Sequence, residues 1–147
     1  MPDKNFRDDL IFKDECYRIM GACFEVYKEE GSGYGEALYQ ECLGIEFDMQ
    51  QIPAIPQPEL ELAYKGRKLK TKFIPDFIAF GKIVIEIKAL DKLTNKERAQ
   101  VINYLKATGY ELAILINFGA YPKLEWERIP RSHRLNNPDQ QENDPLA

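Results

Sequence analysis

Histidine is almost absent from the sequence: the only one among 147 residues, His133, lies in a polar C-terminal stretch. A Ser-His-Asp triad, a Cys-His pair or a histidine-rich metal site would each have to be built on that residue, which argues against all three. The phosphate-binding motif GxxxxGK(S/T) is also missing. Catalysis would therefore depend on carboxylates, lysine, tyrosine or a metal bound by carboxylates.

Cysteines and long apolar runs are also few. Cys16, Cys23 and Cys42 are odd in number and form no CxxC pair, which argues against a disulfide framework or a zinc site. No apolar run approaches the roughly 20 residues of a membrane helix, and the N-terminus lacks the apolar stretch of a signal peptide. We therefore expect a protein of the reducing cytoplasm with no membrane partner.

An excess of positive charge is missing as well, since the formal net charge is −4. Residues 31–129 contain thirteen acidic and thirteen basic side chains, so basic character can only be local. One basic patch stands out, made of Lys65, Arg67, Lys68, Lys70 and Lys72. The chain length suits one domain over residues 12–130, between a flexible N-terminus at 1–11 and a disordered polar tail at 131–147.

Apolar spacing of three and four predicts two N-terminal helices. The first covers about residues 12–30 and ends at the glycine-rich segment 31–35. The second covers about residues 36–50, and its apolar residues on one face are Leu38, Cys42, Ile45 and Met49. Pro53, Pro56 and Pro58 then favour an extended connection.

The period changes to two after the prolines, which predicts strands at 60–64, 69–79 and 83–88 in an antiparallel meander. Thr94 and Glu97 have the spacing of a capping box, so a helix should run to about 108, before Gly109. Strands follow at 111–117 and 123–129. The order ααβββαββ predicts an α/β fold with a mixed central sheet flanked by helices. Leu124, Trp126 and Ile129 could form a homodimer interface or cap the core.

The third strand contains the only E-x-K of the chain, Glu86-Ile87-Lys88. Glu86 and Lys88 share one face of this strand, whereas Ile83, Ile85 and Ile87 face the other way. A hairpin that turns at 80–82 pairs residues whose numbers sum to about 162, so Asp76 should lie opposite Glu86. Two such close carboxylates favour a cation between them, and Mg²⁺ prefers carboxylate oxygens. Alternatively, the two acids simply pair with Lys88 and Lys72 on a solvated face.

Further motifs point to a family. Gly33-x-x-Glu36-x-x-Tyr39 is followed by Pro75-Asp76, Glu86-x-Lys88, Gln100-x-x-Asn103-Tyr104 and Ile116-Asn117-Phe118-Gly119. In this order and spacing, over roughly residues 12–129, the chain resembles the GxxExxY proteins of the PD-(D/E)xK nuclease-like superfamily. The resemblance implies a restriction-endonuclease-like core, in which a helix leads into a three-stranded antiparallel meander, followed by a helix and a further strand.

The same resemblance implies roles for single residues. Asp76 and Glu86 correspond to the metal ligands, Lys88 to the catalytic lysine, and Gln100 to a glutamine near the site. Glu36 has the position of a further ligand from the preceding helix, although it could simply favour the helix dipole. The carbonyl of Ile87 would complete the metal site. Tyr104 lies one turn after Gln100 on the same face and would contact the nucleic acid.

These residues support one leading hypothesis: hydrolysis of nucleic-acid phosphodiester bonds with Mg²⁺ or Mn²⁺. The basic patch at 65–72 would contact the phosphate backbone without sequence selection, or would merely add solubility. The alternative function is a non-catalytic nucleic-acid-binding or assembly module on the same fold. A small-molecule hydrolase has no motif of its own beyond the same carboxylates.

Overall fold

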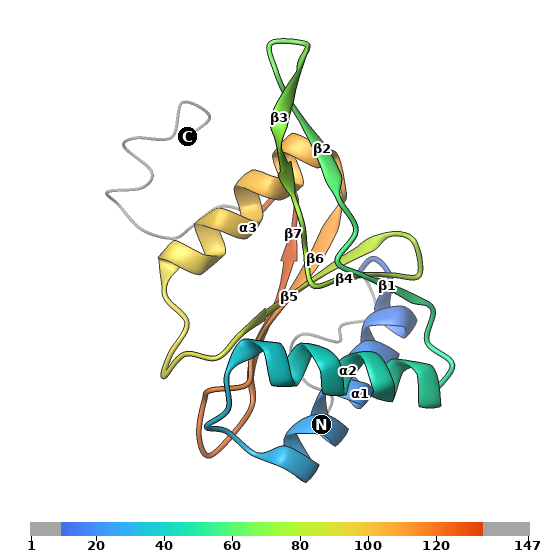
Figure 1. The fold of residues 1–147 in the computed structure, drawn as a ribbon, viewed down its shortest axis with the longest axis vertical. Helices are drawn as coiled ribbons and strands as arrows, with labels where there is room; N and C mark the ends of the chain where they lie inside the picture. The colour runs from blue at the N-terminus through green and yellow to red at the C-terminus, as the bar shows by residue number, and fades with distance from the viewer. Residues whose placement is uncertain (1–9, 134–147) are drawn as a thin grey trace.

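A computed structural model describes residues 10–133 of the chain (Figure 1). Most of the N-terminus (1–11) and of the tail (131–147) that we expect to be flexible lies outside these residues. The elements in chain order are α1 (Lys13–Glu30), α2 (Glu36–Met49), β1 (Ala54–Pro56), β2 (Leu60–Tyr64), β3 (Arg67–Phe73), β4 (Phe77–Ala79), β5 (Ile83–Lys88), α3 (Asn95–Thr108), β6 (Leu112–Asn117) and β7 (Glu125–Pro130).

The centre of the fold is a five-stranded mixed sheet with the strand order β1-β4-β5-β6-β7. The β1, β4 and β5 strands pair antiparallel, β5 and β6 pair parallel, and β7 returns antiparallel along β6. The α3 helix makes the crossover that a parallel pair requires. The α/β class and the mixed sheet predicted from the sequence are therefore confirmed.

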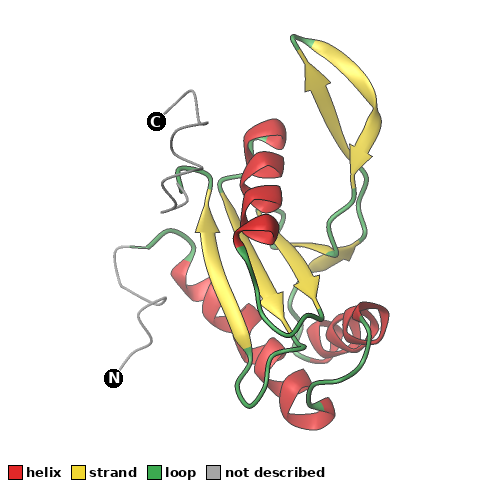
Figure 2. Ribbon diagram, turned by 90° about the vertical axis from the view of Figure 1, so that its left-hand side faces the viewer, coloured by secondary structure: helices red, strands yellow, loops and turns green. Residues whose placement is uncertain are grey.

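Helices cover both faces of this sheet (Figures 1 and 2). Ile83, Ile85 and Ile87 of β5 belong to the core that α1 and α2 cover, whereas Val84 belongs to the core beneath α3. This alternation confirms the two faces predicted for the strand. Leu124, Trp126 and Ile129 are buried in these cores, so they cap the core and do not form an exposed interface.

The buried face of α2 differs from the apolar face predicted for it. Tyr39, Leu43 and Phe47 are buried, whereas Ile45 and Met49 are exposed. The physical reason is aromatic packing, since the Phe47 ring meets Phe77 edge to face with centroids 5.1 Å apart. Large rings bury more apolar area than the aliphatic side chains that the periodicity selected.

The meander also differs in detail from the prediction. The strand expected at 69–79 is two strands, β3 and β4, separated by Ile74, Pro75 and Asp76. Proline has no N–H for a sheet ladder, which explains the break. As a result β2 and β3 form a separate two-stranded hairpin, here called the arm (residues 60–73), and the short β1 replaces β2 beside β4. Figure 2 shows the arm projecting beyond the rest of the fold.

No helix among residues 10–133 is long and apolar enough to cross a membrane.

Candidate active site

The E-x-K motif lies at the carboxyl end of β5, the central strand of the sheet. Glu86 and Lys88 are half-buried, whereas Ile87 between them is buried in the core under α1 and α2. The strand therefore holds an acid and a base on its α3 side by inserting apolar side chains on the other side. Their positions depend on the core, which makes them rigid groups for chemistry.

Asp76 lies where the pairing rule predicts it. The β4–β5 ladder pairs Phe77 with Ile85 and Ala79 with Ile83, so each pair of numbers sums to the predicted 162. One residue before this ladder, the Asp76 N–H donates to Glu86 Oε1 at 3.2 Å, and the Ile87 N–H donates to Asp76 Oδ2 at 2.7 Å. Backbone hydrogen bonds thus hold both carboxyl groups in place.

The two carboxyl groups are electrostatically strained. Burial raises the pKa of Glu86 to about 8, and the neighbouring charge of Asp76 adds to the increase. Burial also raises the pKa of Asp76, although the hydrogen bond from Ile87 and the charge of Lys88 act against it. Perturbed carboxyl groups that share one site are a physical signature of function.

Lys88 and Gln100 are joined by a hydrogen bond. The Lys88 Nζ donates to Gln100 Oε1 at 3.4 Å, which joins β5 to the first half of α3. The charge of Lys88 lowers the pKa values of both Asp76 and Glu86. The charge of the Lys88 ammonium therefore acts on both carboxyl groups, while its hydrogen bond goes to the neutral Gln100.

Glu36 lies farther out than the two acids. It is exposed at the start of α2, and its charge raises the pKa values of Asp76 and Glu86. No group of three or more His, Cys, Asp or Glu side chains in the described part of the chain is arranged to hold a metal ion. The fold thus brings together two of the three acids proposed as ligands, with Glu36 acting on them through its charge.

The donor set nevertheless fits a hard divalent cation. Mg²⁺ typically keeps several waters and binds through one or two carboxylates, so two acidic side chains are enough protein ligands for this ion. The raised pKa values show that negative charge at Asp76 and Glu86 is under-compensated, which a cation would correct. The carbonyl of Ile87, between Glu86 and Lys88, can add a third oxygen.

Tyr39 of the Gly33-x-x-Glu36-x-x-Tyr39 motif braces the structure and is fully buried. Its hydroxyl donates to the Gly31 carbonyl at 2.5 Å, and its ring stacks on Phe118 with centroids 4.6 Å apart. Gly33 has a φ of 112°, a conformation that favours glycine. The motif therefore shapes the connection that leads into Glu36.

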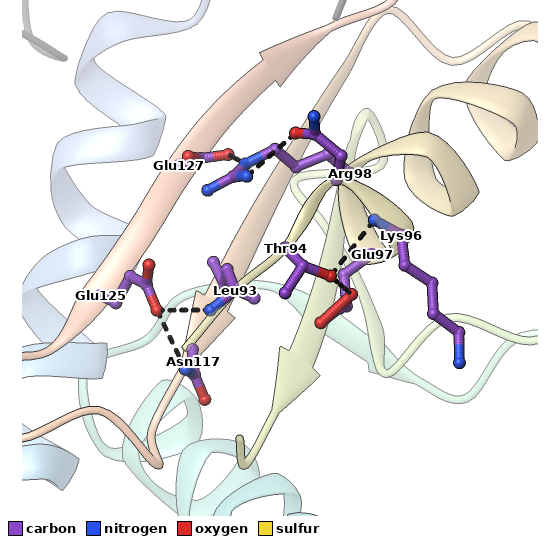
Figure 3. A network of polar contacts seen from close by, with 9 residues as sticks. Leu93, Thr94, Lys96, Glu97, Arg98, Asn117, Glu125 and Glu127 are labelled. Carbon is purple, nitrogen blue, oxygen red and sulfur yellow. Dashed lines mark hydrogen bonds and ion pairs between the residues drawn. The ribbon is translucent and has the colours of Figure 1, made fainter. Parts of the chain in front are cut away.

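A second polar cluster, which sequence reasoning did not interpret, is centred on Asn117, the register partner of Lys88 (Figure 3). The Asn117 Nδ2 donates to the Leu90 carbonyl at 2.9 Å and to Glu125 Oε1 at 3.0 Å. Its Oδ1 accepts from the N–H groups of Leu90 at 2.8 Å and Gly119 at 3.1 Å. The only signal in the sequence was an asparagine that ends an apolar strand, followed two residues later by glycine.

Glycine at position 119 is a steric requirement of this cluster. A Cβ atom there would collide with the backbone nitrogen and carbonyl oxygen of Leu90. Asn117 and Gly119 together hold the loop that follows Lys88 against the end of β6. The cluster therefore fixes the path of the chain as it leaves the candidate site.

The basic patch lies on the arm, and part of its charge is neutralised. Lys68 pairs with Glu61 at 2.6 Å, and Lys72 pairs with Glu59 at 3.4 Å. Lys65 lies over the ring of Tyr64. Arg67, Lys68, Lys70 and Lys72 are all exposed. Such exposed ion pairs are weak, so these lysines remain available to a polyanion.

Tyr104 has a structural contact that the sequence did not predict. Its ring stacks on Phe73 at the base of the arm, with centroids 3.9 Å apart and planes 6° apart. One ring face is therefore occupied, and the contact fastens the arm to α3. The nucleic-acid contact expected of Tyr104 would use only the part of the side chain away from Phe73.

A surface groove of about 590 Å³ lies elsewhere, between α2, β1 and Phe77. Its polar lining includes Gln40, Glu41 and Asp48 but none of the residues of the E-x-K site. The groove thus lacks the strained carboxyl pair that marks the end of β5.

Comparison with known proteins supports the fold. A family model described as the PD-(D/E)XK nuclease superfamily matches residues 13–129. The solved structure described as the crystal structure of SSO0001 matches with a TM-score of 0.53 and 20% sequence identity, a level at which the likeness concerns the fold alone. The match covers 80% of this chain and 62% of that one, so this chain spans less than two thirds of that protein. No curated protein matches the chain.

Proposed function

The chain belongs to the PD-(D/E)XK nuclease superfamily, and from this premise we propose that it hydrolyses phosphodiester bonds of nucleic acid with Mg²⁺ or Mn²⁺. The observation that carries the proposal is the strained pair of Asp76 and Glu86 beside Lys88 at the end of β5. The motif Gly33-x-x-Glu36-x-x-Tyr39 supports placement among the GxxExxY proteins within this superfamily.

The metal would be held by Asp76, Glu86 and the carbonyl of Ile87, with Glu36 as a further ligand or as a distant negative charge. When bound, such an ion supplies a more acidic water and positive charge beside the phosphate. Burial keeps Asp76 and Glu86 fixed, so little reorganisation is needed when the substrate arrives.

Lys88 would act on the reacting atoms directly. The charge of its ammonium acts on both carboxyl groups, so it would orient the attacking water or neutralise charge on the scissile phosphate. Gln100 would keep this ammonium directed through the 3.4 Å hydrogen bond. The arm, through Lys65, Arg67, Lys68, Lys70 and Lys72, would attract the phosphate backbone.

A non-catalytic binding or assembly module is the second candidate function. It is favoured by one observation, the lack of a cluster of three acids arranged for a metal within residues 10–133. The three free cysteines suit the cytoplasm, where we propose that the protein acts. A homodimer would have to use a surface other than the buried Leu124, Trp126 and Ile129.

Cleavage of labelled single- and double-stranded DNA and RNA, with Mg²⁺, Mn²⁺ or EDTA, tests the proposal. We expect wild-type cleavage to require the metal and to fall at least about 100-fold in Glu86→Gln and in Lys88→Met, since each loses a group needed at the reacting phosphate. The matched controls are Glu111→Gln and Lys123→Met, which make the same two changes at exposed residues outside the candidate site.

Calorimetric titration with Mn²⁺ separates the two candidate functions. The nuclease proposal requires Mn²⁺ to bind wild type and to bind Asp76→Asn much more weakly. Failure to cleave any substrate, together with no Mn²⁺ binding by wild type, would exclude the nuclease and leave the binding module.

A further inference from the structure

The outer part of the arm serves no purpose in the core. Every residue from Ala63 to Lys72 is exposed, and the arm pairs with no strand of the central sheet. Only its base is anchored, by the buried Leu62 and Phe73 and by the stacking of Phe73 on Tyr104. An isolated two-stranded hairpin is at best marginally stable, so the fold holds this projection at some cost.

The arm carries a row of positive charge. Lys68 and Lys72 lie on one face of the arm, because Lys68 makes an ion pair with Glu61, the register partner of Lys72. The exposed Lys70 lies between them, where the register of the two strands shifts. Phe73 lies on the other face, which is turned to α3. With five basic side chains against Glu59 and Glu61, the net charge of residues 59–73 is 5 − 2 = +3.

Part of this charge has no acidic partner. Among residues 10–133, no ion pair involves Arg67 or Lys70, whereas Lys68 and Lys72 make exposed pairs that a phosphate can displace. A row of cations along a projecting ribbon matches an extended polyanion and not a compact anion. Nucleic acid provides this charge pattern.

The shape of the arm selects one form of nucleic acid. A two-stranded ribbon fits the major groove of B-DNA, which is about 12 Å wide. The major groove of an RNA duplex is too narrow and deep for side chains to reach the bases. Single strands are usually bound by several stacking aromatic rings, and the outer arm offers only Tyr64.

The arm is also joined directly to the candidate site. β3 ends at Phe73, and the chain continues through Ile74 and Pro75 to Asp76. We propose that the arm docks duplex DNA by entering its major groove, so that the backbone of the same duplex lies beside Asp76 and Glu86. This inference rests on the proposed nuclease function, for which it names double-stranded DNA as the substrate class.

Binding by an uncleaving form tests the inference. The full chain carrying Glu86→Gln is titrated in EDTA against a labelled 20-base-pair DNA duplex, one of its single strands, and the RNA duplex of the same sequence. We expect the DNA duplex to bind at least about tenfold more tightly than the other two. Equal binding of all three, or no binding of the DNA duplex, would overturn the inference.

Two further variants, made in the Glu86→Gln background, assign the binding to the arm. Arg67→Gln with Lys70→Gln removes two of the three arm cations that make no ion pair within residues 10–133, and it leaves Lys65 over the Tyr64 ring. Its matched control, Lys106→Gln with Lys123→Gln, removes two exposed cations elsewhere. The arm variant should lose about tenfold in affinity for the DNA duplex. The slope of the logarithm of its binding constant against the logarithm of salt concentration should become less steep by about two, as expected for two lost phosphate contacts. The inference fails if the control loses as much, or if the arm variant loses nothing.

Docking in the major groove of the DNA is tested with a duplex that carries glucosylated hydroxymethylcytosine, whose sugar fills that groove. This DNA should bind the intact arm about tenfold more weakly than unmodified DNA, and unchanged binding would overturn docking in the major groove. Cleavage by the chain without the Glu86→Gln change separates this inference from the proposed function. Arm-dependent duplex binding without cleavage would refute the nuclease alone, whereas cleavage insensitive to the arm variant would refute the arm alone.

Discussion

The polar groups at the carboxyl ends of the neighbouring strands β5 and β6 differ in how well their surroundings compensate for burial. Lys88 at the end of β5 is the register partner of Asn117 at the end of β6. On the β6 side, the amide of Asn117 makes four hydrogen bonds and is completely buried. On the β5 side, Asp76 and Glu86 share a site in which burial and the charge of neighbouring acids raise both of their pKa values.

The contrast separates structure from function at adjacent strand ends. A buried polar group that only supports the fold is expected to be fully hydrogen-bonded, as Asn117 is. Groups that are left electrostatically strained lower stability, so they persist where a ligand compensates for them. We therefore interpret the β6 end as a scaffold for the loop 89–93 and the β5 end as a site that suits a cation and a phosphate.

The largest change in stability should come from removing the hydrogen-bonded amide at the end of β6. Asn117→Ala leaves the N–H and carbonyl of Leu90 and the N–H of Gly119 without their side-chain partner. At roughly 1–3 kcal/mol for each orphaned buried group, partly relieved by relaxation, we expect a loss of about 4 kcal/mol in unfolding free energy. Urea denaturation measures this loss.

The control for that experiment is Asn103→Ala, at an exposed position of α3. It should change stability by less than about 0.5 kcal/mol. A loss below about 1 kcal/mol in Asn117→Ala would mean that Asn117 does not hold the loop 89–93 in place.

Removing a charge from the carboxyl pair at the end of β5 should raise stability, whereas removing the Asn117 amide should lower it. The ordinary pKa of a glutamate is 4.5, whereas burial raises the pKa of Glu86 to about 8, so the folded state holds this proton more tightly. The protonated Glu86 side chain therefore contributes to the free energy of unfolding. This contribution is fully present below about pH 4.5 and is lost as the pH rises towards 8. Glu86→Gln should therefore be more stable than wild type by about 2 kcal/mol at pH 8 in EDTA, and the difference should shrink towards pH 5.

Thermal unfolding from pH 5 to pH 8 measures this difference, with Glu111→Gln as the exposed control. Addition of Mn²⁺ at pH 8 should stabilise wild type and leave Glu86→Gln unchanged, because the ion replaces the proton. If wild type and Glu86→Gln kept a constant difference across this pH range, the carboxyl pair would not be strained.

The smallest effect concerns α3, the crossover helix that leads from the end of β5 to the start of β6. Thr94 accepts the N–H of Lys96 at 3.3 Å and donates to Glu97 at 2.7 Å, which completes the N-terminal cap of α3 (Figure 3). Thr94→Ala should lower the unfolding free energy by about 1 kcal/mol, and Thr94→Ser should restore most of it. An equal loss in both variants would assign the effect to the methyl group and not to the cap.

Much of the local structure could be predicted because it depends on neighbours in the sequence. The capping residues Thr94 and Glu97 and the αL glycine at 109 bound α3 as their types require. The pairing sum around the turn at 80–82 brought Asp76 opposite Glu86 from hairpin arithmetic alone. Alternation in β5 likewise separated Glu86 and Lys88 from the isoleucines.

Other features could not be predicted because they join residues far apart in the chain. The bonds between Asn117 and Leu90 span 27 residues, and nothing near position 117 indicates its partner. The ring of Phe73 stacks on Tyr104 of α3, which fastens the base of the arm to a helix that follows much later in the chain. Apolar periodicity likewise could not anticipate that aromatic packing would choose the buried face of α2.

By itself, the sequence determined the helices, most strands, the family and the three residue types of the site, because each depends on local spacing or on a short motif. Only the tertiary structure decided that Asp76 and Glu86 would be strained, because burial and repulsion arise when separate segments meet. It also decided that Asn117 would be satisfied and that the lysines would lie on a projecting arm. Long-range packing, which no local pattern encodes, determines all three.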